Sequence, residues 1–234
     1  MKEYLLRTKQ NPCAVKFNIT GMGQDVPLYL QGYDPLIPFS YYFNSKFLIS
    51  GREEIVMNCP LSPSFLKINV FSDDDALIDV TGVTKLPFDR PSDVPDWMGF
   101  IETFSRNFGT YTPITPLYYR PGVPFQIEMV RKIYREDGKE HATPARIAVE
   151  LPIIQVSYNK FRDISIPGRV AILCHEVAHN FINNDGDNEQ EADDNGLRVY
   201  TYLGYPKIEA INSFAEIMND SDVNVQRMSN LITI

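Results

Sequence analysis

The spacing of hydrophobic residues changes along this chain, and that change limits the folds available to it. Through about the first ninety residues, hydrophobic and polar side chains alternate, as in AVKFNIT, where Val15, Phe17 and Ile19 would share one face. Such alternation is typical of half-buried strands. Farther along, hydrophobic residues recur mainly at helical spacing. We therefore predict an α+β fold that begins with a β-sandwich-like region.

A domain boundary is expected in the segment Leu86–Trp97, where three prolines stand among polar residues. The sequence thus divides into a β-rich accessory domain, 1–90, and a second domain, 91–234. For the second domain we predict a twisted sheet followed by several helices. A helix carrying Trp97 should begin near Ser92 or Asp93, either of which can cap it.

Two shorter patterns supply the strands of the second domain. Asp137-Gly138 is a strong signal for a tight hairpin turn. The segment IIQVSY, Ile153–Tyr158, alternates as a strand does, and it could be an edge strand to which an extended peptide adds. In the first domain, the acidic segment Ser72–Asp75 is interpreted as a hairpin loop.

Charge and cysteine content exclude several classes of function. The net charge is −8, the isoelectric point is about 4.9, and basic residues do not cluster. Because nucleic-acid-binding proteins carry a basic surface, no nucleic-acid partner is expected.

The three cysteines lie far apart without a CxxC pair, which favours a reducing compartment. No run approaches the ~18 hydrophobic residues of a membrane span, so we expect a cytoplasmic protein.

The segment HEVAH places two histidines around a glutamate in a predicted helix. Ser165 can cap this helix, and Pro167 suits its first turn. Residues four apart lie on one helix face, so His175 and His179 can both reach one zinc ion. Glu176 lies about 100° around the helix. It would border the metal and take a proton from a water molecule that zinc activates.

A second predicted helix follows and can complete the site. Asn188 can cap it, and Glu189 and Asp193 lie four residues apart on one face. Ala192 and Gly196 are small enough to let two helices approach closely. Glu189 can then be the third metal ligand, which leaves the fourth position to water, and Asp193 can accept a hydrogen bond from the far nitrogen of a ligand histidine.

Other interpretations of these residues exist. The motif could be a buried helix followed by a solvated acidic segment, in which the glutamates only complement the helix dipole. Asp185 is an alternative third ligand, at the last ligand position of a different zinc motif. Cys174 is interpreted as a small buried residue, and His141 as part of a surface loop.

HEVAH followed by EQEAD resembles the gluzincin metallopeptidases, whose pattern is HExxH…ExxxD. The resemblance covers about residues 153–204, and it implies a zincin-like domain in which the first glutamate of EQEAD, Glu189, is the third zinc ligand. The segments TPARI, IQVSY and YLGYPKIEA also resemble small peptidase-like proteins of tailed phages, including crAss-like phages. In such genomes a peptidase-like fold can serve as a virion part.

The leading hypothesis is therefore a zinc metallopeptidase that acts on a peptide or protein substrate, with Glu176 as the catalytic base. Its oxyanion donor is not fixed by any motif. Four residues near the predicted site could supply it: Tyr158, Tyr200, Tyr202 and Arg198. The alternative is a phage assembly protein, such as a tail or neck ring component. In such a protein, zinc would only stabilise the fold. The protein would bind other virion proteins or copies of itself.

Overall fold

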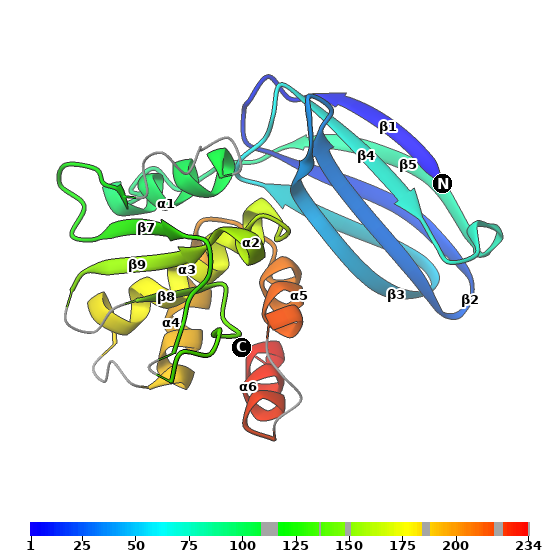
Figure 1. The fold of residues 1–234 in the computed structure, drawn as a ribbon. Helices are drawn as coiled ribbons and strands as arrows, with labels where there is room; N and C mark the ends of the chain where they lie inside the picture. The colour runs from blue at the N-terminus through cyan, green and yellow to red at the C-terminus, as the bar shows by residue number, and fades with distance from the viewer. Residues whose placement is uncertain (109–116, 136, 148–150, 184–187, 218–221, 234) are drawn as a thin grey trace. The chain divides into compact units, whose positions relative to one another are not determined.

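The computed structural model describes residues 1–108, 117–135, 137–147, 151–183, 188–217 and 222–233 (Figure 1). The chain divides into two compact units. The first unit comprises Met1–Pro91 together with Leu203–Glu209, and the second comprises Ser92–Tyr202 together with Ala210–Ile234. The fold is α+β, as predicted, with an antiparallel sheet first, a mixed sheet next, and helices toward the C-terminus.

The first unit is built on one antiparallel sheet in which the strand order is β1-β4-β2-β3 and β5 also pairs with β2. Its strands are β1 (Lys2–Arg7), β2 (Cys13–Asp34), β3 (Ile37–Cys59), β4 (Phe65–Phe71) and β5 (Ile78–Pro87). The long strand β2 pairs with β3 along one edge, and its other edge is shared between β5 and β4. The sheet is therefore organised around the β2–β3 hairpin.

The two ends of this hairpin face each other across one hydrophobic core. Phe17 lies opposite Ile55 near one end of the ladder, and Phe43 lies opposite Gly32 near the other. Their ring centroids are nevertheless only 6.1 Å apart, so the sheet bends back on itself. The Phe43 ring lies over its ladder partner Gly32, where a Cβ atom would be 2.4 Å from the ring. The β-rich region predicted at the start of the chain is therefore confirmed as one antiparallel sheet.

The segment Ser72–Asp75 does not form a hairpin. It connects β4 to β5 through a short 3-10 helix (Asp75–Leu77), and these two strands both pair with β2 instead of with each other. Asp74 caps that helix by accepting a hydrogen bond from Ala76 N at 3.0 Å. The acidic residues therefore lie in a solvated turn. The hairpin prediction was wrong only in that β4 and β5 do not pair with each other.

The segment Leu203–Glu209 belongs to the first unit although it follows the predicted site in sequence. Glu209 explains the grouping: its buried carboxylate accepts hydrogen bonds from Asn44 N, at 2.7 Å, and from the Ser45 hydroxyl on β3.

The second unit contains a four-stranded mixed sheet with the order β6-β7-β9-β8. Its strands are β6 (Leu117–Tyr118), β7 (Gln126–Val130), β8 (Ala145–Ile147) and β9 (Ile153–Ser157). β9 is parallel to β7 and antiparallel to β8. The strand predicted from IIQVSY is thus confirmed, but its expected edge position is wrong, because β9 is flanked on both sides. Among the described strands, β8 and β6 lie at the edges.

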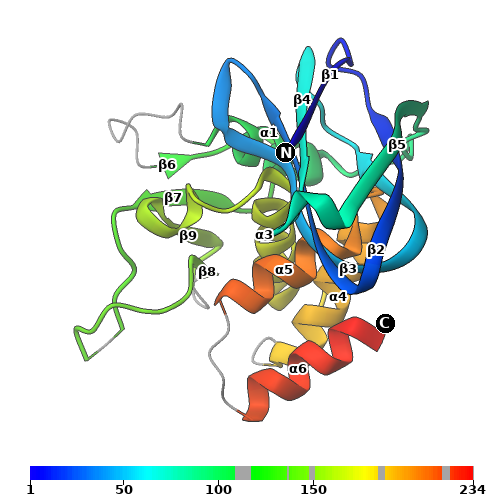
Figure 2. The same ribbon diagram turned by 90° about the vertical axis from the view of Figure 1, so that its right-hand side faces the viewer.

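Six α-helices are present in the described part of the chain. They are α1 (Asp96–Asn107), α2 (Tyr158–Phe161), α3 (Ile166–Phe181), α4 (Glu189–Tyr202), α5 (Lys207–Ile217) and α6 (Asp222–Thr233). Helix α3 packs against α1, β8, β9 and α4, and α6 packs against α4 (Figures 1 and 2). Helix α1 begins after Pro95 without a side-chain cap, so the expected cap at Ser92 or Asp93 is not made.

A buried arginine fixes the start of α3. Arg169 is 2% exposed and donates hydrogen bonds to the carbonyl oxygens of Phe161, Ser105 and Arg162 at 2.8–3.0 Å. Its guanidinium also lies 5.1 Å from the ring centroid of Phe108. Because these partners come from α1, from α2 and from the residues that follow them, α3 is held against both.

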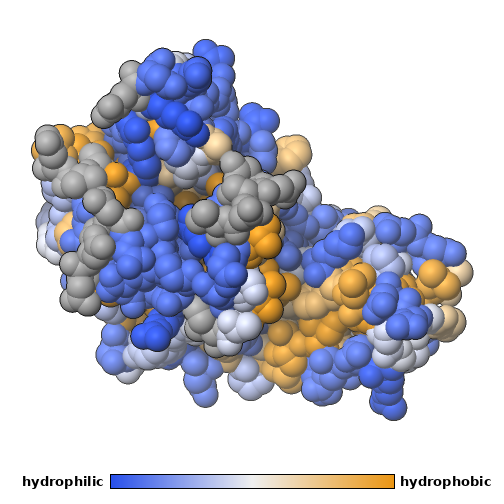
Figure 3. Space-filling view, turned by 90° about the horizontal axis from the view of Figure 1, so that it is seen from below, coloured by the Kyte–Doolittle hydropathy of each residue, from blue (hydrophilic) through white to orange (hydrophobic). Residues whose placement is uncertain are grey.

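Hydrophobic residues are visible at the surface of the β-rich unit (right-hand part of Figure 3). Large exposed side chains on β3 include Phe39, Leu48 and Val56. Folded proteins commonly expose such residues, and these carry no functional assignment. Across the described ranges, no helix has the length and apolar character needed to cross a membrane.

Candidate metal centre

Helix α3 begins where the sequence predicts. The Ser165 hydroxyl accepts a hydrogen bond from Gly168 N at 3.2 Å, and Pro167 occupies the first turn. The middle of the helix is buried in the second unit, and His175 and Glu176 are only 8% and 7% exposed. These two residues of HEVAH are therefore largely shielded from water.

Helix α4 brings its acidic face to α3. Asn188 caps it, accepting a hydrogen bond from Glu191 N at 3.0 Å. The two helices approach closely at Gly196, where a Cβ atom would lie only 2.8 Å from the Cα of His175. Ala192 is fully buried one turn earlier. The close approach expected from these small residues is confirmed.

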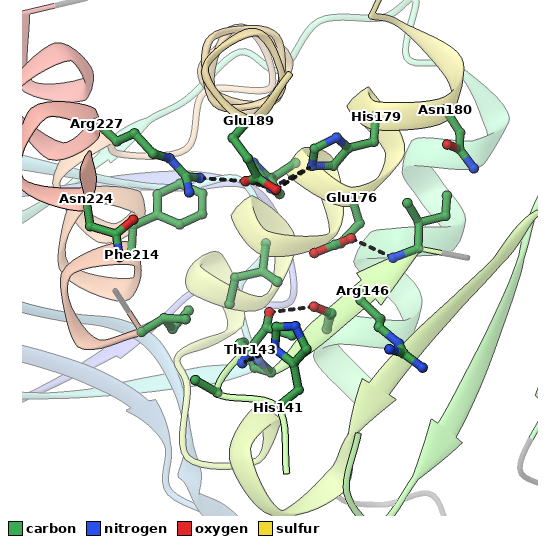
Figure 4. Close-up of a pocket in the computed structure, with 17 residues that line it drawn as sticks. His141, Thr143, Arg146, Glu176, His179, Asn180, Glu189, Phe214, Asn224 and Arg227 are labelled. Carbon is green, nitrogen blue, oxygen red and sulfur yellow. Dashed lines mark hydrogen bonds and ion pairs between the residues drawn. The ribbon is translucent and has the colours of Figure 1, made fainter. Parts of the chain in front are cut away.

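This packing gathers three potential metal ligands: His175, His179 and Glu189. Figure 4 labels two of them, His179 and Glu189, which lie next to each other. The two Nε2 atoms are 3.1 Å apart, and the Glu189 carboxylate oxygens lie 3.5 Å from His175 Nε2 and 3.7 Å from His179 Nε2. A tetrahedral ion with bonds of about 2.1 Å would hold its ligand atoms about 3.4 Å apart. The three donors thus already stand at the separations that such an ion requires.

The opposite side of the His175 ring faces a buried carboxylate. His175 Nδ1 lies 2.9 Å from Asp193 Oδ1. Burial disfavours a charge on the ring, but the carboxylates of Asp193 and Glu189 outweigh burial and raise the pKa of His175 to about 10. Without a metal, the ring therefore carries a proton at neutral pH.

Arg227, on α6, completes this network, and the sequence did not predict its role. Its guanidinium donates to Asp193 through Nε at 2.7 Å and Nη2 at 3.0 Å, and Nη2 also lies 2.9 Å from Glu189 Oε2. Contact with His175 is the main reason that the pKa of Glu189 falls to about 2, and Arg227 adds to it. The half-exposed carboxylate is therefore ionised and able to bind a cation.

Glu176 lies beside the three-residue cluster and is held from the sheet. Its Oε2 accepts a hydrogen bond from Ile147 N at 2.7 Å, at the end of β8 (Figure 4). Burial is the largest influence on this carboxyl group and raises its pKa, although the charges of His175 and His179 oppose the shift. A carboxylate with a raised pKa is suited to accept a proton and later release it.

A cavity of about 520 Å³ opens next to these residues. Besides the cluster, its lining combines hydrophobic side chains, including Ile172 and Phe214, with the polar groups of His141 and Arg227. A cavity that combines an apolar lining with a few convergent polar groups is typical of a ligand-binding site.

His141 was interpreted as a surface-loop residue, but it lines this cavity. Its Nδ1 accepts a hydrogen bond from Thr143 N at 3.2 Å, so in the neutral ring the proton is on Nε2. Burial is the main cause that lowers the pKa of His141, with Arg135 and Arg146 contributing. At neutral pH the ring is uncharged and can donate a hydrogen bond from Nε2.

The four residues considered as oxyanion donors lie elsewhere. Tyr158 packs against Phe108, with ring centroids 5.7 Å apart, and Tyr200 is fully buried. Tyr202 donates to Asp93 Oδ1 at 2.6 Å, and Arg198 is exposed. All four are in the described part of the chain, and none lines the cavity.

Of the remaining sequence interpretations, Cys174 is fully buried, as expected. Asp185, the alternative third ligand, lies outside the described residues.

Comparison of the chain with protein-family models, with curated proteins and with solved structures finds no match. The geometry of the site is therefore the only indication of function. That geometry defines a group of two histidines and one glutamate that could hold a metal ion.

Proposed function

We propose that the protein is a zinc-dependent peptidase. The observation that carries the proposal is the joint placement of Glu176 and the three-residue cluster at one cavity. A metal site that served only to stabilise the fold would not need a buried carboxylate beside its ligands. Two imidazoles and one carboxylate, with a fourth position open to water, form a ligand set used by catalytic zinc.

Bound zinc would supply Lewis acidity for a peptide carbonyl and for a water molecule. The chain supplies the proton transfers. Glu176 accepts the proton of the attacking water and delivers it to the leaving nitrogen, and burial raises the pKa of its carboxyl group toward the value that such a transfer requires. Asp193 orients the His175 ring through Nδ1, so that Nε2 points to the cluster.

The missing donor for the oxyanion is assigned to His141. Its Nε2–H belongs to a neutral ring at the cavity wall, on the side formed by the loop before β8 (Figure 4). A preorganised donor in a partly dry cavity stabilises developing negative charge more than water does. The four residues considered from the sequence do not line the cavity, and His141 replaces them.

The proposal is tested by measuring metal content and hydrolysis together. We expect purified protein to bind zinc and to cleave an unfolded protein such as labelled casein, and a chelator to abolish cleavage until zinc is restored. Glu176→Gln should keep its zinc and lose about 10²–10⁴-fold in rate. Glu191→Gln is the matched control, because Glu191 also carries a carboxylate but is not part of the cluster.

Cleavage that survives in Glu176→Gln would rule out this mechanism. Zinc binding without cleavage, together with ring-shaped oligomers, would instead favour the alternative predicted from the sequence, an assembly protein in which zinc only stabilises the fold.

A further inference from the structure

Two of the three cysteines meet at one end of the first sheet. Cys13 is the first residue of β2 and Cys59 is the last residue of β3, and they are direct partners in the antiparallel ladder. Both side chains are buried, at 4% and 1% exposure. The remaining cysteine, Cys174, belongs to the second unit. The sequence alone, with these residues far apart, did not suggest the pairing.

Their position in the ladder is compatible with a disulfide bond. Directly opposite residues of antiparallel strands have Cα atoms about 4.5 or about 5.5 Å apart, depending on the hydrogen-bonding pattern. Disulfides join residues whose Cα atoms are about 4.4–6.8 Å apart. Side chains of directly opposed residues also lie on the same face of the sheet. Joining Cys13 to Cys59 would therefore need no rearrangement of the strands.

The surroundings give the two thiols different reactivity. A hydrogen bond with Cys59 is the largest influence on Cys13 and lowers its pKa, and the charge of Lys85 acts in the same direction against burial. The same hydrogen bond, together with burial, raises the pKa of Cys59. Cys13 is therefore the sulfur that becomes the thiolate, which is the nucleophilic form.

The pair is located at one end of the sheet, where the chain enters β2 and leaves β3. The ends of three strands meet at this level, because Cys13, the first residue of β2, pairs both with Cys59 on β3 and with Pro87, the last residue of β5. The chain before β2 contains Lys9 and Gln10, which have left-handed φ angles of 58° and 62°. Such conformations are unfavourable for residues other than glycine. Backbone hydrogen bonds from Thr8, Lys9 and Gln10 to the carbonyl oxygens of Pro63 and Ser64 tie the chain before β2 to the chain after β3. A small oxidant therefore reaches the buried thiols when these strand ends open locally.

We infer that Cys13 and Cys59 form an oxidisable dithiol, a modification site that a small disulfide such as oxidised glutathione converts into an intrachain disulfide. The Cys13 thiolate attacks one sulfur of glutathione disulfide and releases one glutathione thiolate. Cys59 then loses its proton, attacks the Cys13 sulfur and releases the second glutathione thiolate. Two protein thiols are oxidised and one disulfide is reduced to two thiols, so electrons balance.

The bond would close the β2–β3 hairpin covalently at its open end. That hairpin organises the whole first sheet, and a crosslink across so long a loop removes conformational entropy from the unfolded chain. In a reducing compartment the dithiol form persists. In an oxidising environment the first unit becomes more resistant to unfolding. This inference is independent of the proposed peptidase activity.

The test uses the full chain, reduced, freed of reductant and then incubated with oxidised glutathione. After acid quenching, free thiols are alkylated under denaturing conditions, and peptides are mapped by mass spectrometry without reduction. We expect one peptide pair linked through Cys13 and Cys59, with Cys174 alkylated. Cys59→Ser should trap glutathione on Cys13, and Cys13→Ser should leave Cys59 alkylated. Cys174→Ser is the matched control and should form the same link.

Circular dichroism confirms that each sample is folded before alkylation. The inference would be overturned if all three cysteines were found alkylated in protein that was folded during glutathione treatment. Disulfide links that involve only Cys174 or a second chain would also overturn it. The stabilising role is tested separately by thermal unfolding. The oxidised wild type should melt at least about 5 °C above the reduced form, and Cys59→Ser should show no such difference. Equal midpoints for the two wild-type forms would refute that role.

Discussion

His175 Nδ1 lies 2.9 Å from Asp193 Oδ1, on the side of the ring opposite the other two members of the metal cluster. Asp193 is itself held by two hydrogen bonds from Arg227. Three elements, α3, α4 and α6, therefore determine the orientation of one imidazole ring. Such support fixes the ring and makes its other nitrogen a better ligand.

Replacing Asp193 by asparagine should weaken zinc binding about 10–100-fold, because His175 loses the carboxylate that orients it. Competition with a chromophoric chelator measures the affinity. Asp194→Asn is the matched control: Asp194 is the next residue on α4, and its carboxylate accepts from Gln190 instead. Equal zinc affinities for the two variants would show that the contact between Asp193 and His175 does not support the metal.

The metal-free protein should lose stability as pH rises from 6.5 toward 10. The pKa of His175 is about 10 in the folded chain, compared with 6.5 for a free imidazole. Its stabilising contribution is therefore fully present below pH 6.5 and lost as the pH approaches 10. At about 1.4 kcal/mol per pKa unit, the loss is on the order of a few kcal/mol.

Urea unfolding in the presence of a chelator, at pH 6.5, 8 and 9.5, measures this loss. His175→Gln lacks the titrating group, so its free energy of unfolding should fall less over the same range. If the free energy of unfolding of His175→Gln fell with pH as steeply as that of the wild type, the pH dependence would have to come from other groups. With zinc bound, the trend should reverse, because protons no longer compete for His175 as pH rises.

Replacing Gly196 by alanine should separate α4 from α3 and disrupt the metal cluster. The new Cβ would lie 2.8 Å from the Cα of His175 and 2.9 Å from its backbone nitrogen, which cannot move aside independently of the helix. Overpacking of this kind costs about 1–3 kcal/mol. We expect a lower melting midpoint and weaker zinc binding.

Gly99→Ala on α1 is the control, because its Cβ would meet only the end of the Arg120 side chain, at 3.3 Å. Alanine is also the better helix former, so this variant should be neutral or stabilising. Zinc affinity that remained at the wild-type level in Gly196→Ala would mean that the helices can separate without disturbing the ligands.

The parts of the site that could be predicted from sequence depend on local rules. Ser165 and Asn188 cap their helices as expected, and the spacing of His175 and His179 places both on one face of α3. The small residue at Gly196 indicated that a second helix would come close. Each of these inferences needs only the geometry of a single helix.

The parts that could not be predicted depend on chain segments that meet only in the fold. Arg227 is the only basic residue of α6, but nothing in its neighbourhood identifies Asp193 as its partner. The polar sequence around His141 is typical of a surface loop, and only the packing of that loop beside β8 turns the ring toward the cavity. The interior position of β9 was missed for the same reason, because the local sequence does not show that β7 and β8 pair with it on its two sides.

His141→Ala should reduce the turnover number for peptide hydrolysis about 10²-fold, because the transition state loses a hydrogen-bond donor. The Michaelis constant should change much less, and zinc content should not change, because His141 is not part of the cluster. His141→Gln keeps an amide donor and should recover part of the rate.

Asn180→Ala removes another polar group from the cavity wall and is the control, with an expected effect below about threefold. A turnover number unaffected in His141→Ala would return the oxyanion donor to the other groups of the cavity, with Arg227 first among them, because its Nη2 lies 2.9 Å from Glu189 Oε2.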